Sequence, residues 1–291
     1  MLALTTIFNG DSNQTTEIKD ALERIARAGF SHIHWVNRFL SFHIYSVYEM
    51  LQIKEWCDEL KLTVKGIHAP EGELKSDLKS YVSLNQYNRL AGVEMIKNRI
   101  DMAHMLNTDS IVLHLPLPWK LFENNADLKK EFFRNALKTF DELESYCTAY
   151  RIRICVENSG STPPEHTRYM FDTLFERYSA DFVGFCFDTG HANIACKDNC
   201  LEYAERYNDR LYMIHIHDSL EGKGDHLIPF EGTFNWEGFA AVLARSPYQF
   251  PILMECTLKS EKYPPGEHSD WLKKAFEAGN RFSEMVQKYK G

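Results

Sequence analysis

The stretch FVGFCFDTGHAN, residues 182–193, begins with an apolar run and ends with residues that can bind metals or move protons. The run is short and rich in Phe and Val, which favours a buried strand over a helix. It ends at Asp188, and His191 follows three residues later. The same pattern, a polar residue at the end of an apolar run, recurs on both sides of this stretch.

Eight apolar runs are present along the chain, and each is followed by a longer amphipathic stretch. The apolar runs are LALTTIF (2–8), HIHWV (32–36), TVKGIH (63–68), SIVLH (110–114), IRICVE (152–157), FVGFCFD (182–188), LYMIHIH (211–217) and PILMEC (251–256). The amphipathic stretches, with apolar residues at helical spacing, are 16–29, 47–62, 88–106, 129–150, 164–178, 201–207, 235–245 and 268–289. Strict alternation of strands and helices requires parallel strands joined by right-handed crossovers.

This alternation predicts the α/β class and a closed (β/α)8 TIM barrel, because eight strand–helix repeats in 291 residues match the size of that fold. The competing fold is an open doubly wound sheet, whose first turn is usually Gly-rich. The first turn here reads FNGDSNQ, residues 8–14, and contains no GxGxxG motif. Because no linker-like segment divides the chain, we expect one barrel domain over residues 1–291.

The composition is that of a globular protein, with 44% hydrophobic and 25% charged residues, and it excludes a disordered chain. The mean hydropathy is −0.39, and no apolar run approaches the roughly 20 residues that a membrane helix needs. The N-terminus lacks the basic region of a signal peptide, and the seven Cys form no CxxC pair, so we expect reduced thiols and a cytoplasmic location. The net charge of −8 argues weakly against nucleic acid as a partner. No feature of the sequence predicts an oligomeric state.

Polar residues end six consecutive strands of the predicted barrel. With the loops that follow, they are His68, His114, Glu157, Asp188, His191, His215, His217, Asp218, His226 and Glu255. The carboxyl ends of the strands form the reactive face of a TIM barrel, so these side chains are expected to meet there. A carboxylate within an apolar run is costly unless it is paired or metal-bound. Mixed carboxylates and imidazoles therefore indicate a divalent metal, and strand alternation lets either His215 or His217 point inward.

The motifs that carry these residues occur in a fixed order between residues 66 and 256. They are GIHAP (66–70), VLHLP (112–116), VEN (156–158), FDTGHAN (187–193), HIHD (215–218), GDHLIPFEGTFNW (224–236) and MEC (254–256). In these motifs the chain resembles the xylose-isomerase-like TIM barrels. That superfamily contains sugar (phosphate) isomerases and epimerases together with abasic-site nucleases of the endonuclease IV type.

The resemblance implies a principal divalent metal held by Glu157, Asp188, His215 and Glu255. In the HIHD motif the family's ligand precedes the acidic residue by three positions, which selects His215 over His217. It also implies that His68 and His114 lie beside Glu157, where the nuclease branch holds a second metal. His191 and His226 match positions that hold a third metal in the nuclease branch and face substrate in the sugar branch. Mn²⁺, Zn²⁺, Mg²⁺ and Co²⁺ can all use such ligands, so the residues leave the metal open.

The sequence departs from the nuclease pattern at several of these motifs. Gly224 stands where the nuclease has an Asp two residues before its loop His, and Asp225 directly precedes His226. The turn after strand 4 reads HLPLP (114–118) in place of HPG, and the stretch before the loop His reads EGKG (221–224), without the nuclease's Arg. These departures favour the sugar branch.

We therefore expect a metal-dependent isomerase or epimerase of a small sugar, keto-sugar or related polyol, in which Glu157 and Glu255 move a proton. The competing interpretation of these two residues is ligation alone. The alternative functions are a zinc-dependent abasic-site DNA phosphodiesterase and a dehydratase of the same fold. Trp119 and Lys223 are weaker candidates for substrate contacts, because ordinary loop packing and a solvated lysine explain them at least as well.

Overall fold

The computed structural model describes residues 1–8, 18–36, 43–70, 79–220, 223–258 and 268–290. Its main sheet has eight parallel strands in the order β10-β1-β2-β3-β4-β5-β6-β7. The strands are β1 (Leu2–Thr5), β2 (His32–Trp35), β3 (Thr63–His68), β4 (Ser110–His114), β5 (Arg153–Glu157), β6 (Val183–Asp188), β7 (Leu211–His215) and β10 (Ile252–Met254). All eight predicted strands are confirmed in position and direction.

The sheet closes on itself between β7 and β10. Ile216 pairs with Met254, the amide of Ile216 donates to the carbonyl of Leu253 at 2.8 Å, and the amide of Glu255 donates to Ile216 at 3.1 Å. This closure confirms the single-domain (β/α)8 TIM barrel. It also brings the end of β7 beside the end of β10, so that two of the predicted metal ligands, His215 and Glu255, lie next to each other.

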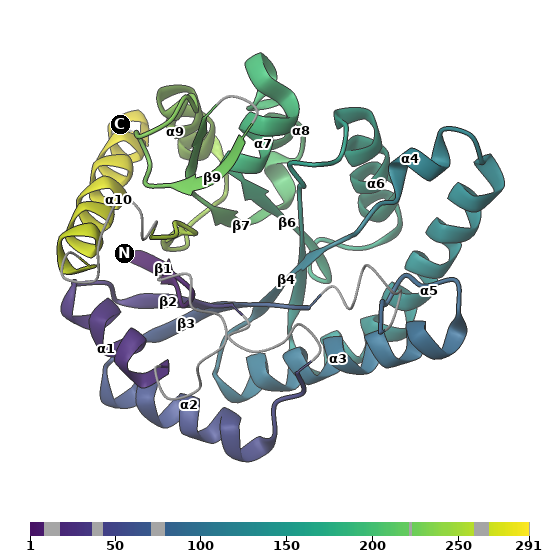
Figure 1. Ribbon diagram of the computed structural model, residues 1–291, viewed down its shortest axis with the longest axis horizontal. Helices are drawn as coiled ribbons and strands as arrows, with labels where there is room; N and C mark the ends of the chain where they lie inside the picture. Colours follow the sequence, from purple (N-terminus) through teal and green to yellow (C-terminus); the bar gives the residue numbers. More distant parts are fainter. Residues whose placement is uncertain (9–17, 37–42, 71–78, 221–222, 259–267, 291) are drawn as a thin grey trace.

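Helices surround the ring of strands on its outer side (Figure 1). They are α1 (Ile18–Arg27), α2 (Val47–Glu59), α3 (Gln86–Met105), α4 (Trp119–Phe122), α5 (Ala126–Tyr150), α6 (Pro164–Arg177), α7 (Thr189–Cys196), α8 (Glu202–Arg206), α9 (Trp236–Arg245) and α10 (His268–Lys290). None of the helices in the described part of the chain is both long and apolar enough to cross a membrane.

Two apolar clusters fill the molecule, one on each side of the strands. The larger one contains the outward-facing residues of the strands and the helix faces that cover them. The smaller one lies inside the barrel and consists of Ala3, Val112, Cys155, Cys186, Met213 and Leu253. Because side chains alternate along a strand, the residue two positions after Cys155, Cys186, Met213 or Leu253 also faces inward. Those residues are Glu157, Asp188, His215 and Glu255, so the polar layer lies directly on an apolar floor.

Three elements were not predicted from the sequence. A hairpin of β8 (Asp218–Leu220) and β9 (Lys223–Leu227) follows β7, and the short helices α4 and α7 follow β4 and β6. Each of these elements occupies a loop at the carboxyl end of the barrel. They therefore add walls to the predicted reactive face and leave the barrel itself unchanged.

Candidate metal centre and catalytic face

The four residues that the family resemblance assigns to the principal metal come together in the structure. One donor atom each of Glu157, Asp188, His215 and Glu255 lies within 4.8 Å of the others. Nδ1 of His215 lies 3.1 Å from a carboxylate oxygen of Glu157 and 3.1 Å from one of Glu255. Strand register explains this proximity, because Asp188 is the direct partner of His215 and the other two residues end nearby strands.

The carboxylate of Asp188 is held in a fixed orientation by its neighbours. The side-chain amide of Asn158 makes two hydrogen bonds to the backbone of this residue. Its nitrogen donates to the carbonyl of Asp188, and its oxygen accepts from the amide of Asp188, at 2.9 Å each. One carboxylate oxygen of Asp188 accepts from the amide of His191 at 2.6 Å and so caps α7. The capping bond explains why a helix starts directly after this strand, and it leaves the second oxygen for other partners.

Burial and missing hydrogen bonds indicate that this cluster has room for a cation. Glu157 and His215 are 1% and 0% exposed, yet both carboxylate oxygens and both ring nitrogens lack a hydrogen bond of acceptable geometry within the described part of the chain. Buried polar atoms are rarely left in this state, because the desolvation cost is not recovered. Three carboxylates and one imidazole form a donor set that suits a divalent metal, so the residues present fit the implied cofactor.

The electrostatics of the cluster favour the same conclusion. Burial alone would raise the pKa of Glu157 and of Glu255. The imidazoles of His114 and His215 nevertheless hold the pKa of Glu157 well below its usual range, and His215 has the same effect on the pKa of Glu255. Burial alone would lower the pKa of His215, whereas the neighbouring Cys186 and the carboxylates of Glu255 and Glu157 raise it well above its usual range. The cluster therefore concentrates negative charge, which a cation or a proton on His215 must balance.

His68 and His114 lie beside Glu157, as the resemblance implies. Their Nε2 atoms lie 3.7 Å and 3.3 Å from a carboxylate oxygen of Glu157. Nδ1 of His68 is 2.9 Å from the carbonyl of Ala69, a contact that orients the ring toward the carboxylate. The three residues form a second group whose donor atoms converge.

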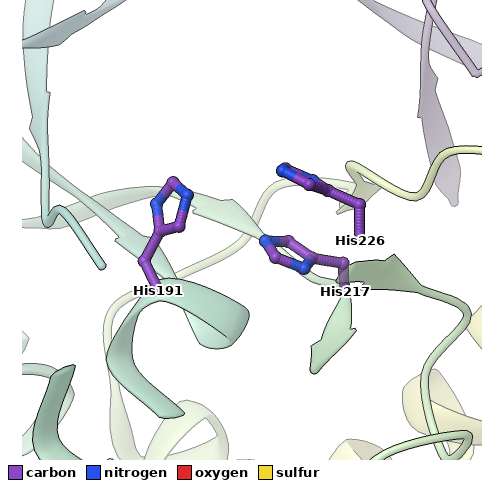
Figure 2. A group of neighbouring side chains, drawn as sticks. All are labelled: His191, His217 and His226. Atoms are coloured by element: carbon purple, nitrogen blue, oxygen red, sulfur yellow. The ribbon is translucent and has the colours of Figure 1, made fainter. Parts of the chain in front are cut away.

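The imidazoles of His191, His217 and His226 form a further cluster (Figure 2). The cluster adjoins Asp188, because Nε2 of His217 lies 3.0 Å from its carboxylate. A ring nitrogen of each of His191, His217 and His226 lies within 4.8 Å of the others, and the rings of His217 and His226 stack at 4.1 Å between centroids. Burial and the nearby His217 lower the pKa of His226, whose Nδ1 lies 2.9 Å from the carbonyl of Glu255. A neutral His226 therefore carries its proton on Nδ1 and offers Nε2 as an acceptor.

His191 differs from His226 in charge. Burial alone would lower the pKa of His191, but the carboxylates of Asp188 and Glu157 raise it to about 10. Its Nδ1 lies 3.2 Å from Glu157 and 3.1 Å from the carbonyl of Asn158. A protonated His191 beside a neutral His226 gives this wall of the site one donor and one acceptor.

His34 and Cys186 were not predicted as site residues, and no role was predicted for His217. His34 lies on β2, its ring centroid is 4.7 Å from that of His215, and neither of its nitrogens has a hydrogen-bond partner among the described residues. Its sequence signal was a polar residue between Ile33 and Trp35 in an apolar run, although the run does not end there. Cys186 joins Glu157 and His215 in another group of converging donors, but burial raises the pKa of its thiol well above the usual range.

Asp218 belongs to the loop architecture. Its two carboxylate oxygens accept from the amides of Ser219, Phe230 and Phe234 at 2.9 to 3.1 Å and from Nε1 of Trp236 at 2.8 Å. A Cβ on Gly232 would lie 2.3 Å from this carboxylate, which explains a glycine at that position. The acidic residue of HIHD therefore orders the segment that leads into α9.

The two weaker substrate candidates have different outcomes. Trp119 begins α4, and its indole nitrogen donates to the carbonyl of Ser161 at 3.1 Å, which joins the loop after β4 to the loop after β5. The backbone of Lys223 lies in β9, whereas its side chain is outside the described residues. A cavity of about 1060 Å³ opens between these loops, and its wall includes His114, His191 and His226.

Comparison with known proteins agrees with this architecture. Residues 22–275 match the family described as xylose isomerase-like TIM barrel. The chain is also 31% identical over 283 residues to the uncharacterized protein y4fM of Sinorhizobium fredii (strain NBRC 101917 / NGR234), with 92% of this chain and 89% of that protein covered.

Several solved structures share the fold at low sequence identity. A D-tagatose 3-epimerase-like protein has a TM-score of 0.77 and 22% identity, with 100% of this chain and 99% of that chain covered. D-psicose 3-epimerase from Clostridium cellulolyticum H10, solved with D-tagatose, has a TM-score of 0.74 and 15% identity over 98% and 99% of the two chains. The 3-keto-D-glucoside 4-epimerase YcjR from E. coli has a TM-score of 0.67 and 17% identity over 90% and 97%.

Proposed function

Because the chain belongs to the xylose isomerase-like TIM barrel family, we propose that it is a metal-dependent isomerase or epimerase of a small sugar, keto-sugar or related polyol. The observation that carries this proposal is the buried donor set of Glu157, Asp188, His215 and Glu255, whose donor atoms lie within 4.8 Å of one another. The sugar epimerases among the similar structures support the substrate class.

Glu157, Asp188, His215 and Glu255 would hold the metal. A divalent cation bound there would polarise a substrate carbonyl and acidify the neighbouring C–H bond. The protein's own contribution is orientation, because Asn158 fixes the backbone of Asp188 and the capping bond to α7 fixes its carboxylate. The cavity beside the cluster gives a sugar access to this face of the barrel.

Glu157 and Glu255 are the proposed proton carriers. They approach Nδ1 of His215 from different strands, each at 3.1 Å, so a substrate bound at this point would meet a carboxylate on two sides. Neighbouring imidazoles keep the pKa of both carboxyls well below the usual range, so both start as bases. One carboxylate would accept the proton, and the other, or the same one, would return it. His191 and His226 would bind the substrate's hydroxyl groups.

A second candidate function is zinc-dependent hydrolysis of a phosphodiester. The observation in its favour is the number of imidazoles outside the principal donor set, with His68 and His114 at Glu157 and the His191–His217–His226 cluster at Asp188. Such a centre would hold more than one metal ion. Elemental analysis separates the candidates, because we expect about one metal ion per chain for the sugar enzyme and about three for a nuclease.

The direct test is hydrogen exchange on sugars. We expect the metal-loaded protein to incorporate deuterium from D₂O next to the carbonyl of at least one ketose from a panel. A dehydratase would also release water, which the mass of the product reveals. Incision of an abasic-site duplex without exchange on any sugar would replace this proposal by the nuclease.

A further inference from the structure

We propose that the sugar acted on here carries an apolar substituent, which lies in the groove beside the metal centre. This inference rests on the proposed function and refines its substrate class from free keto-sugars to keto-sugars that are conjugated to an apolar group and keep the carbonyl that the reaction needs. The groove is the cavity of about 1060 Å³ that is lined by the segments following β3, β4 and β5. It is continuous with the site, because His114 and His191 line it and lie 3.3 Å and 3.2 Å from the carboxylate of Glu157.

The size of the groove exceeds the needs of a free monosaccharide. Cavities of about 300–1000 Å³ enclose ligands of drug size. The groove reaches the upper end of that range, at about 1060 Å³. A sugar held against the metal cluster would therefore leave a large part of this volume to another group of the same ligand.

The chemistry of the wall specifies that group. Beyond the imidazoles the wall combines a large apolar part with several hydroxyl residues. The apolar part consists of Leu84, Leu115, Leu117, Leu121, Leu128 and Phe132, and the hydroxyl residues are Ser80, Ser83, Ser159, Ser161 and Thr162. Leu84 and Leu121 are 45% and 60% exposed, so two large apolar side chains at the groove are exposed to solvent. Adjacent exposed apolar surface beside a concave site is typical of a binding surface for an apolar ligand. A hydroxyl-rich free sugar would gain little from the apolar part of this wall.

The groove is built into the fold on both sides. On one side the hydroxyl of Tyr81 donates a hydrogen bond to the carbonyl of His114. The backbone carbonyl of Tyr81 accepts a hydrogen bond from the hydroxyl of Thr139 at 2.6 Å. A Cβ on Gly92 of α3 would lie 2.4 Å from the amide of Tyr81, so the helix is shaped to receive this segment. On the other side Trp119 binds the carbonyl of Ser161. These anchors preform the groove, and the ligand gains affinity without the cost of ordering it.

The experiment compares matched ligands. Isothermal titration of the metal-loaded protein with methyl and phenyl glycosides of glucose, galactose and mannose measures what the apolar group adds. We expect at least one phenyl glycoside to bind about tenfold more tightly than its methyl partner, a gain that a single buried ring can supply. Leu84→Glu and Leu121→Glu should each remove most of that gain and leave the methyl glycoside unchanged.

Leu90→Glu is the matched control, because Leu90 is 47% exposed on α3 and is not part of the groove wall. It should keep the full preference for the phenyl glycoside. Equal affinities for every methyl and phenyl pair would overturn the inference, and so would a preference that survives in both groove variants. A dimer that Leu121→Glu dissociates, without any phenyl preference in the wild type, would assign the groove to a second copy of the chain and also overturn it.

Hydrogen exchange separates this inference from the proposed function. Exchange on a free ketose together with no phenyl preference rejects the inference and keeps the isomerase. A groove-dependent phenyl preference without exchange on any sugar, conjugated or free, keeps the apolar-substituted ligand and rejects the isomerase.

Discussion

Nε2 of His217 lies 3.0 Å from a carboxylate oxygen of Asp188, and both side chains are completely buried. The other carboxylate oxygen of Asp188 accepts from the amide of His191. His217 is therefore a positioning residue for one of the proposed metal ligands, whereas His215, two residues earlier, faces the metal cluster directly. Outer partners of this kind fix the orientation of the ligands that they contact.

This relationship predicts a graded loss of metal in two variants. His217→Ala should weaken metal binding about 10- to 100-fold, the usual effect of losing an outer partner. His215→Ala should weaken it more, because the variant removes a donor atom. Titration with Mn²⁺ followed by electron paramagnetic resonance measures both affinities. The exposed His104 on α3 supplies the control, and His104→Ala should bind metal like the wild type. A greater loss in His217→Ala than in His215→Ala would exchange the two roles.

Gly190 gives a second prediction, because its position is set by the ring of His217. A Cβ on Gly190 would lie 2.0 Å from Cε1 and 2.3 Å from Nδ1 of that ring. Gly190→Ala should therefore push the imidazole aside, lower the free energy of unfolding by about 1–3 kcal/mol and weaken metal binding. Thermal and urea unfolding measure the first effect.

The double variant Gly190→Ala/His217→Ala tests the cause. Removal of the ring makes room for the new methyl group, so the double variant should be more stable than Gly190→Ala alone. Metal affinity should stay low in the double variant, because Asp188 still lacks its partner. Equal instability of the single and double variants would show that the backbone at residue 190, and not the ring, is what the methyl group disturbs.

The acidity of the site predicts how metal binding responds to pH. Burial opposes a charge on His215, but Cys186, Glu255 and Glu157 raise its pKa well above 6.5, which favours a proton on this ring in the metal-free protein. A metal binds the neutral ring and must displace that proton. Metal affinity should therefore rise with pH above neutrality. Calorimetric titrations in buffers of different ionisation enthalpy should show release of at least one proton per metal ion.

The free energy of unfolding of the metal-free protein should change in the direction opposite to that of metal affinity, and should fall as the pH rises above neutrality. The raised pKa of His191, about 10, contributes stability that is fully present below the unfolded value of 6.5 and is lost as the pH rises toward 10. The lowered pKa values of Glu157 and Glu255 contribute stability above 4.5 that is lost as the pH falls through their folded values. Stability of the metal-free chain that increases steadily from pH 7 to 10 would contradict this account.

The barrel could be predicted because each strand shows the same local signal, a short apolar run followed by a helical period. The site followed from strand ends, since Glu157, Asp188 and Glu255 are polar residues in otherwise apolar runs. The hairpin that carries His226 could not be predicted, because its strands are three and five residues long and lack an apolar period. Its pairing depends on contacts with distant segments, such as the bond from His226 to the carbonyl of Glu255.

His34 shows a different limit of the sequence. Alternation of side chains along β2 places this residue on the inner side of the barrel. An inward-facing side chain can take part in the site only if the residues around it leave room for it. Gly66 on the adjacent strand supplies that space, since a Cβ there would lie 3.2 Å from Nδ1 of His34. The pairing of His34 with Gly66 depends on a shift in register between β2 and β3. That shift cannot be predicted from the sequence of either strand alone.

The last prediction concerns the two carboxylates that flank His215. Glu157→Gln and Glu255→Gln keep the size of the side chain and one oxygen donor but abolish proton acceptance. Each variant should retain substantial metal and lose at least about a hundredfold in turnover, because general acid–base catalysis contributes roughly 10²- to 10⁴-fold. Elemental analysis and deuterium exchange, measured on the same preparation, separate the two effects, and Glu165→Gln on the surface helix α6 is the control. Loss of activity in proportion to loss of metal would make Glu157 and Glu255 ligands only. The proton would then be carried by another group, with His191 and His226 as the next candidates, since both line the cavity next to the cluster.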